Sequence, residues 1–218
     1  KIIINKINKF NFIYGDITSK PFTIIIATEK NKNNPINHPH WHRSLGITYN
    51  HIDKILIKDK GFAHISQSRF NQVIEHELNH LFINRIDFKK STPRWFKEGF
   101  AMWHANEITL KHKISIVKKI FKDELFDLNE IENLNKLNKI EYDLAYAQSA
   151  LYIDALQNIY GEKIFVSILD FIRSGNDFKN AVYKATGHDI FSIEENIIIF
   201  LKHKYSWLKF LNLTDMLF

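Results

Sequence analysis

The pattern of apolar positions separates a first third with short apolar runs from a longer part with helical spacing. The runs Pro21–Thr28, Gly46–Tyr49 and Lys54–Lys58 are rich in β-branched residues and bounded by polar stretches, as strands are. Between the first two runs, Glu29–Ser44 is rich in Asn, Pro and His, which is typical of a loop. From Ser66 onward, apolar residues recur every three or four positions, which is the period of a helix.

The helical part divides into several segments. The first begins near Ser66, and the second runs from Arg94 to about Asn106, with Thr92 as its N-cap and Pro93 at its first position. Further helices are predicted at about 109–122, 142–160, 162–174, 177–186 and 192–204. Three of these end at glycines 161, 175 and 187, and Ser192–Glu195 reads as a capping box that opens the last.

This order of elements predicts an α+β fold. Residues 1–90 would form a small N-terminal β-sheet lobe that ends in the first long helix, and residues 91–218 a mainly helical C-terminal lobe. We expect the two lobes to work as one unit, because 218 residues suffice for one sizeable core or two closely packed lobes.

Composition narrows the function classes. The net charge of +6 comes from scattered lysines with acidic residues among them, which argues against nucleic-acid binding. The absence of cysteine excludes disulfides, thiolate catalysis and cysteine-ligated zinc. No apolar run approaches the roughly 20 residues of a membrane span. The first residue is Lys1, so we expect an exported or envelope-associated bacterial protein whose signal or membrane tether lies outside this sequence. The oligomeric state stays open.

The motif His76-Glu77-Leu78-Asn79-His80 lies in the middle of the first helical segment. Residues four apart share one face of a helix, so both imidazoles could bind one cation at two of its four tetrahedral positions. Glu77 would then point beside the cation, where it could accept a proton from zinc-bound water. The apolar neighbours Val73–Ile74 and Leu81–Phe82 would bury the two histidines, which then need a polar partner such as a metal ion.

A catalytic zinc ion needs a third protein ligand and one open position. Glu98 follows His80 by eighteen residues and belongs to the second predicted helix, with two tryptophans and two phenylalanines within five positions. Such neighbours favour burial, where an unpaired carboxylate is costly. Gly99 would let this helix pack closely against the first. We therefore predict Glu98 as the third ligand of one Zn²⁺ ion, with Glu107 as the next residue to consider at a poorer spacing.

These residues resemble the gluzincin metallopeptidases, specifically the peptidase MA-like group. That group joins H-E-x-x-H to a later W-x-x-E-G-x-A, which Trp95–Ala101 matches. Downstream, Tyr146–Ser149 heads a helix that ends at Tyr160–Lys163, and the likeness covers about residues 20–200. The final predicted helix lacks the tryptophan that such domains often carry, and Trp207 lies just beyond it.

The resemblance implies a zincin-like fold, in which the H-E-x-x-H helix packs on the N-terminal sheet. It implies a zinc cofactor, a peptide or protein substrate, and an edge strand near Ile55–Lys58 that pairs with an extended peptide. It also implies a tyrosine that donates a hydrogen bond to the oxyanion of the tetrahedral intermediate. Tyr146 is the best positional match, and Tyr142, one helical turn earlier, is the alternative.

The sequence therefore predicts a zinc-dependent metallopeptidase in which Glu77 assists the attack of zinc-bound water on a peptide bond. Two alternatives stay open: a catalytically silent binding or scaffold domain with the zincin fold, and a structural zinc protein. An intact Glu77 argues against the first, and the lack of cysteine and of an obvious fourth histidine argues against the second. The histidines at 38, 40 and 42 are interpreted as an exposed loop rather than a second metal site, and His104 as a packing residue.

Overall fold

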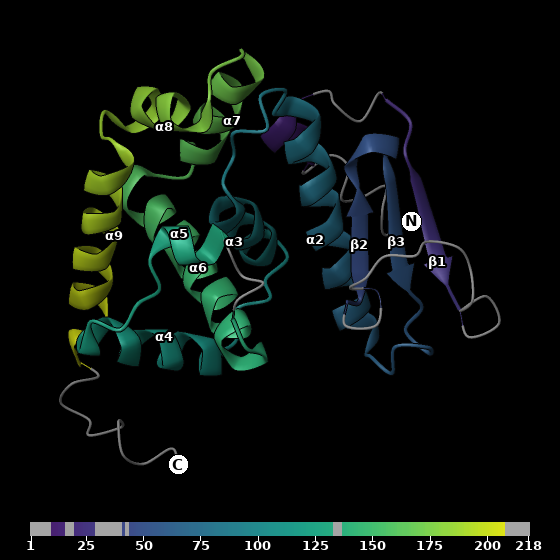
Figure 1. Cartoon of the computed structure of the whole chain (residues 1–218), viewed down its shortest axis with the longest axis horizontal. Helices are drawn as coiled ribbons and strands as arrows, with labels where there is room; N and C mark the ends of the chain where they lie inside the picture. Colours follow the sequence, from purple (N-terminus) through teal and green to yellow (C-terminus); the bar gives the residue numbers. More distant parts are fainter. Residues whose placement is uncertain (1–9, 16–19, 29–40, 42–43, 133–136, 208–218) are drawn as a thin grey trace.

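The computed structural model describes residues 10–15, 20–28, 41, 44–132 and 137–207. A small sheet lies at one side of the molecule and most helices at the other, with α2 between them (Figure 1). The strands are β1 (Thr23–Ala27), β2 (Gly46–Tyr49) and β3 (Lys54–Lys58), and a 3-10 turn, η2 (Asn50–Ile52), precedes β3. The helices are α2 (Gln67–Ile86), α3 (Arg94–His104), α4 (Leu110–Lys122), α5 (Leu128–Glu132), α6 (Lys139–Tyr160), α7 (Ile164–Arg173), α8 (Phe178–Thr186) and α9 (Ile190–Lys204). The predicted α+β fold is confirmed.

The sheet has the strand order β1-β3-β2, with β1 parallel and β2 antiparallel to the central β3. Ile55, Leu56 and Ile57 of β3 are almost fully buried, because strands flank them on both sides and α2 packs on the sheet. A continuous apolar run is typical of such a central strand. The prediction of an edge strand near Ile55–Lys58 is therefore wrong. Among the described strands, β2 is the edge strand that contacts α2.

Residues 10–14 form a helical turn that was not predicted, because five residues are too few to show a helical period. Phe10 and Tyr14 are fully buried against α2. The ring of Phe10 packs on Phe82 with centroids 5.2 Å apart, and the Tyr14 hydroxyl donates to Asn79 Oδ1 at 2.7 Å. The same two rings also contact α3, because Phe10 packs on His104 and Tyr14 on Phe100, so this turn packs against both helices.

Helices α3 and α6 approach each other closely at Gly99 of α3. A Cβ atom at this position would lie 2.5 Å from the backbone oxygen of Ser149 in α6, so only glycine fits. Gly99 was expected to bring α3 close to the H-E-x-x-H helix. This expectation is wrong, because the glycine faces α6, while the adjacent Glu98 faces α2.

Helix α3 begins at Arg94 as predicted, but its N-cap differs from the prediction by one residue. Pro93, not Thr92, precedes the helix, and its extended backbone provides no side-chain cap. The backbone amides of Arg94 and Trp95 donate instead to Glu132 of α5. The short helix α5 was not predicted from the sequence, yet its last residue caps the helix that carries Glu98.

The other helix ends follow local capping rules. Helix α9 starts before the predicted capping box at Ser192–Glu195, because Asp189 is the N-cap and accepts a hydrogen bond from the amide of Ser192. The capping-box prediction is therefore wrong. The predicted glycine stops are confirmed at Gly161 and Gly187, the C-caps of α6 and α8, where φ is +89° and +78°.

The apolar core runs without interruption from the sheet to the helices. Ile55 of β3, Phe82 of α2, Phe100 of α3 and Phe165 of α7 all belong to one cluster of buried residues. The division into lobes at residue 90 stays a prediction. No helix among the described residues combines the length and the apolar character needed to cross a membrane.

The close approach of α3 and α6 predicts that Gly99→Ala destabilises the protein. The added methyl group would meet backbone rather than a movable side chain, so the free energy of unfolding should fall by about 1–3 kcal/mol or more, as in other overpacked cores. Urea unfolding measures this change. The control is Gly61→Ala, where the new Cβ atom would meet only the end of the Asp59 side chain at 3.1 Å. Equal stability of the two variants would show that α3 can move away from α6 without cost.

Candidate metal centre

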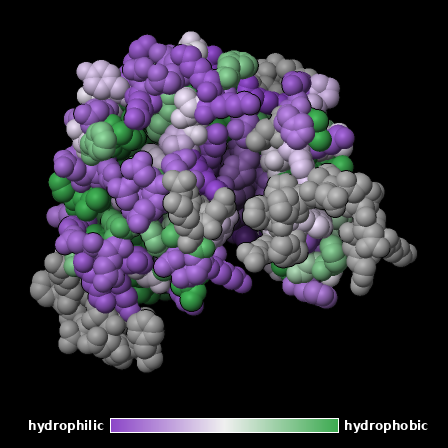
Figure 2. All heavy atoms as spheres, viewed as in Figure 1, coloured by the Kyte–Doolittle hydropathy of each residue, from purple (hydrophilic) through white to green (hydrophobic). Residues whose placement is uncertain are grey.

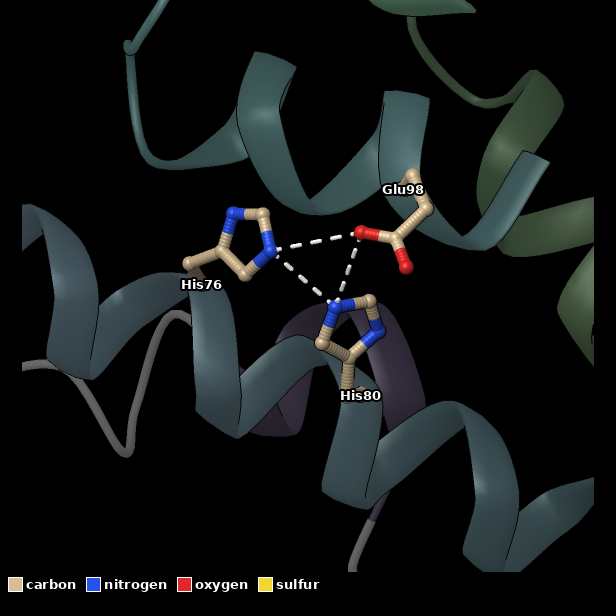
Figure 3. A group of neighbouring side chains, drawn as sticks. All are labelled: His76, His80 and Glu98. Carbon is tan, nitrogen blue, oxygen red and sulfur yellow. Dashed lines mark hydrogen bonds and ion pairs between the residues drawn. The ribbon is translucent and has the colours of Figure 1, made fainter. Parts of the chain in front are cut away.

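Three side chains from α2 and α3 converge on one point (Figure 3). The Nε2 atoms of His76 and His80 lie 3.0 Å apart. Glu98 Oε2 lies 3.5 Å from the first of these atoms and 3.3 Å from the second. Each of the three side chains retains about 15% of its surface exposed, so the site is reachable from solvent. Figure 2 shows a hollow lined by hydrophilic residues in the region between α2 and α3.

The short connection between α2 and α3 places Glu98 opposite the two histidines. Asp87, directly after α2, accepts hydrogen bonds from the amides of Ser91 and Thr92 at 3.1 and 2.8 Å. The hydroxyl of Ser91 in turn accepts from the amide of Phe178 in α8 at 2.9 Å. These bonds fix where α3 begins relative to the end of α2. Glu98 then comes one turn into α3, facing the middle of α2 (Figure 3).

The three side chains are electrostatically coupled. Burial alone would raise the pKa of Glu98, but His80 and His76 outweigh it and hold the pKa of this carboxyl well below its usual value. Burial alone would lower the pKa of His76, but Glu107 and Glu98 raise this pKa well above its usual value. Positive charge on the imidazoles and negative charge on the largely buried Glu98 thus stabilise each other, and a metal cation could provide the positive charge in place of a proton.

The donor set fits a zinc ion. Two imidazole nitrogens and a carboxylate oxygen are common zinc ligands, and these three lie within 4.8 Å of one another. Within the described parts of the chain, no fourth His, Cys, Asp or Glu joins this group. Three protein ligands leave one coordination position open, which is the arrangement of catalytic rather than structural zinc sites.

The buried side chain of Glu77 lies where α2 packs against the edge strand β2. Its carboxylate accepts a hydrogen bond from the Thr48 hydroxyl at 2.7 Å, and the same hydroxyl lies 3.0 Å from the Glu77 backbone oxygen. Gly46 gives this carboxylate its room, because a Cβ atom there would lie 2.7 Å from Glu77 Cγ. Burial lowers the pKa of His76 while Glu107 and Glu98 raise it, and the negative charge of Glu77 adds a smaller effect in the raising direction. Strand β2 thus holds the predicted base close to the candidate metal ligands.

Tyr142 and Tyr146 form a stacked pair on α6 at the same site. Their hydroxyl oxygens are 2.8 Å apart, and Arg94 Nη2 donates to the Tyr146 oxygen at 3.3 Å. Burial, and next the charge of Glu98, raises the pKa of Tyr146 well above its usual value. The phenol therefore stays protonated and able to donate a hydrogen bond at neutral pH. The structure brings both candidate tyrosines to the neighbourhood of Glu98.

The other predicted candidates have different positions. His104 is buried, packs against Phe100 and lies 3.1 Å from the Asn79 amide, so it is a packing residue as predicted. Glu107 lies beside Nδ1 of His76, on the ring edge away from Glu98, and does not belong to the converging group. The three histidines at 38, 40 and 42 lie outside the described residues.

Sequence reasoning missed Thr48, Gly46 and Arg94. The first two lie on a strand about thirty residues before Glu77, and nothing in a sequence pattern pairs a particular strand residue with a particular helix residue. Arg94 carried a local signal, because it precedes Glu98 by one helical turn, and its Nε lies 3.9 Å from Glu98 Oε1.

The fold and the converging side chains define a class of protein, in which an H-E-x-x-H helix and a glutamate of the next helix assemble a candidate metal centre beside a small sheet. The family model of the Peptidase MA superfamily matches residues 5–203. The chain belongs to this superfamily, which confirms the resemblance to the peptidase MA-like group. Comparisons with curated proteins and with solved structures give no match.

The geometry predicts that Glu98→Ala weakens zinc binding strongly. Losing one of three donors should lower the affinity by more than about 100-fold, beyond the 10–100-fold cost of losing an outer hydrogen-bond partner. Competition with a chromophoric chelator measures the affinity. Glu162→Ala removes an exposed carboxylate elsewhere and serves as the control. Unchanged affinity in Glu98→Ala would place the third ligand elsewhere.

Proposed function

We propose that this chain is a zinc-dependent metallopeptidase, with His76, His80 and Glu98 as zinc ligands and Glu77 as the general base. The observation that carries the proposal is the convergence of these three donors beside a buried carboxylate that β2 holds in place. Membership of the Peptidase MA superfamily supports the peptidase activity. Peptides or proteins are the proposed substrates.

Each residue has a separate task in peptide hydrolysis. A zinc ion held by these residues would act as a Lewis acid and would lower the pKa of a water molecule bound to it. Glu77 accepts a proton from the attacking water and transfers it to the leaving amine. The Thr48 hydroxyl donates to Oε2 of Glu77, which fixes the orientation of the carboxylate and leaves its other oxygen to accept this proton.

Strand β2 is the proposed docking edge for the substrate. It pairs with β3 on one side, and within the described chain no strand pairs with its other side. An extended peptide added there would form main-chain hydrogen bonds and would pass the strand that carries Thr48 and so lies next to Glu77. This placement replaces the predicted edge near Ile55–Lys58.

Tyr146 is the proposed oxyanion donor. Arg94 donates to its phenol oxygen, so the phenol proton is directed toward Tyr142 or toward the site. Tyr142 has the same hydroxyl chemistry and remains the alternative.

The alternative of a catalytically silent domain would require neither Glu77 nor its support by Thr48 and Gly46. Turnover of a generic peptide, together with zinc content, separates that alternative from the peptidase. The location of the protein in a cell envelope, with a tether outside this sequence, stays a prediction.

The role of Glu77 predicts that Glu77→Gln binds zinc normally and loses most of its peptidase activity. The amide keeps the shape of the side chain and can still accept from Thr48, but it cannot take up a proton at neutral pH. A loss of about 100-fold or more in kcat is expected, the scale of removing a general base. Zinc content and kcat are measured on the same preparation. Near-normal turnover would remove Glu77 from the mechanism.

The paired tyrosines predict different results for two matched variants. Tyr146→Phe should lower kcat by roughly ten- to a thousand-fold, the scale of losing one oxyanion donor, with little change in KM or zinc content. Tyr142→Phe should have the smaller effect, because its hydroxyl reaches the site only through Tyr146 in this proposal. The opposite order would identify Tyr142 as the donor, and normal kcat in both would assign the oxyanion to another group.

A further inference from the structure

Glu107 lies beside the one ring nitrogen of His76 that faces away from the converging donors. Its Oε2 is 3.5 Å from His76 Nδ1, while Nε2 of the same ring faces Glu98 and His80. Two carboxylates of the α3 segment thus flank one imidazole, one at each nitrogen. This position excludes Glu107 as a ligand of an ion held at Nε2.

The Nδ1 atom of His76 is buried and has no hydrogen-bond partner within the described residues at standard distances and angles. Glu107 is the nearby acidic group that could accept its proton, although the 3.5 Å between Oε2 and Nδ1 is longer than an ordinary hydrogen bond. A neutral imidazole carries one proton, so a proton held at Nδ1 leaves the lone pair at Nε2 free to bind a metal ion. The ring nitrogen that is protonated therefore decides whether His76 can be a ligand.

Glu107 is itself held in place from α2. Its side chain is only 7% exposed, and its Oε1 lies 3.1 Å from Arg69 Nη1 in an ion pair whose angles are not those of a hydrogen bond. Arg69, Gln72 and His76 lie on one face of α2, since they are spaced by three and four residues.

The backbone around Glu107 is fixed as well. Its amide donates to the Met102 carbonyl at 2.9 Å, and the preceding Asn106 has a left-handed φ of 55°. The Asn106 carbonyl accepts from Gln72 Nε2 at 2.8 Å. The end of α3 is therefore tied to α2 one helical turn before His76.

We propose that Glu107, anchored by Arg69, is a positioning residue that holds the proton of His76 on Nδ1 and orients the ring so that Nε2 faces the metal. The inference rests on the proposed zinc site. It assigns a second task to the part of the chain that runs from α3 to Glu107, just after the helix ends. Glu98 provides a ligand atom to the ion, and Glu107, nine residues later, orients the ligand His76 on α2. Outer carboxylate partners of this kind raise the basicity of a histidine ligand and fix its orientation.

The test compares the unmodified protein with Glu107→Gln and Gln72→Ala. Glu107→Gln keeps the size of the side chain and removes its charge, and zinc affinity should fall by about 10- to 100-fold. Gln72→Ala loosens the same loop and removes the 3.3 Å hydrogen bond from Arg69 Nη1 to Gln72 Oε1, but it keeps Arg69, His76 and Glu107. It should leave the affinity within about threefold, a change below 1 kcal/mol. Equal losses in the two variants would reduce Glu107 to a residue that only holds the loop, and this result would overturn the proposal.

A second readout follows the ring proton directly. In ¹⁵N-labelled, zinc-loaded protein, the Nδ1 proton of His76 should resonate downfield and shift upfield in Glu107→Gln but not in Gln72→Ala. If the resonance shifts in neither variant, the contact between Glu107 and His76 is contradicted.

If Glu107→Gln fails to fold, Arg69→Gln provides a second test, because it removes only the ion pair that anchors Glu107. This variant should also weaken zinc binding, by a smaller factor, and an unchanged affinity would contradict the anchoring role. If the unmodified protein binds no zinc, the proposed zinc site itself is wrong. If the unmodified protein and Glu107→Gln bind zinc with the same affinity, only the role of Glu107 is overturned.

Discussion

Glu98 is a carboxylate that α3 buries against two imidazoles, and the surrounding structure serves to keep it there. Burial opposes its negative charge, so the contact persists only with positive charge nearby. On the opposite side of α3, Gly99 lies against the Ser149 backbone of α6, and this contact sets how closely α3 packs on α6. Asp87 and Glu132 fix the turn and the first amides of α3. A helix held at both its start and its far face leaves Glu98 little freedom to turn away from α2.

Helix α2 is also held in place by contacts from several segments, because it buries polar as well as apolar side chains. Glu77 is paired with Thr48, and Asn79 with Tyr14 and His104, so these two buried side chains have partners from other parts of the chain. Satisfied buried networks favour one arrangement over its alternatives. Helix α2, which carries the candidate metal ligands His76 and His80, is therefore supported from the strand side, from the N-terminal turn and from α3 at once.

Much of this site follows from sequence because its geometry is local. The histidines at 76 and 80 share a face in any helix, and the aromatic residues around Glu98 signalled its burial. The failures concern contacts between distant segments. The apolar run Ile55–Ile57 is typical of a central strand, but the prediction of an edge strand followed the family resemblance, so the central place of this strand was missed. The contact of Gly99 with α6, and the cap from Glu132, likewise depend on how helices cross, which hydrophobic spacing does not encode.

The central claim is that two imidazoles and one carboxylate hold a single zinc ion with a position left open. X-ray absorption at the zinc edge of the loaded protein tests it most directly. The account predicts one zinc per chain with two histidine ligands at about 2.0–2.1 Å, a carboxylate oxygen, and a further light-atom ligand from solvent. Absence of bound zinc, or a shell with only one histidine or with more than two, would contradict it.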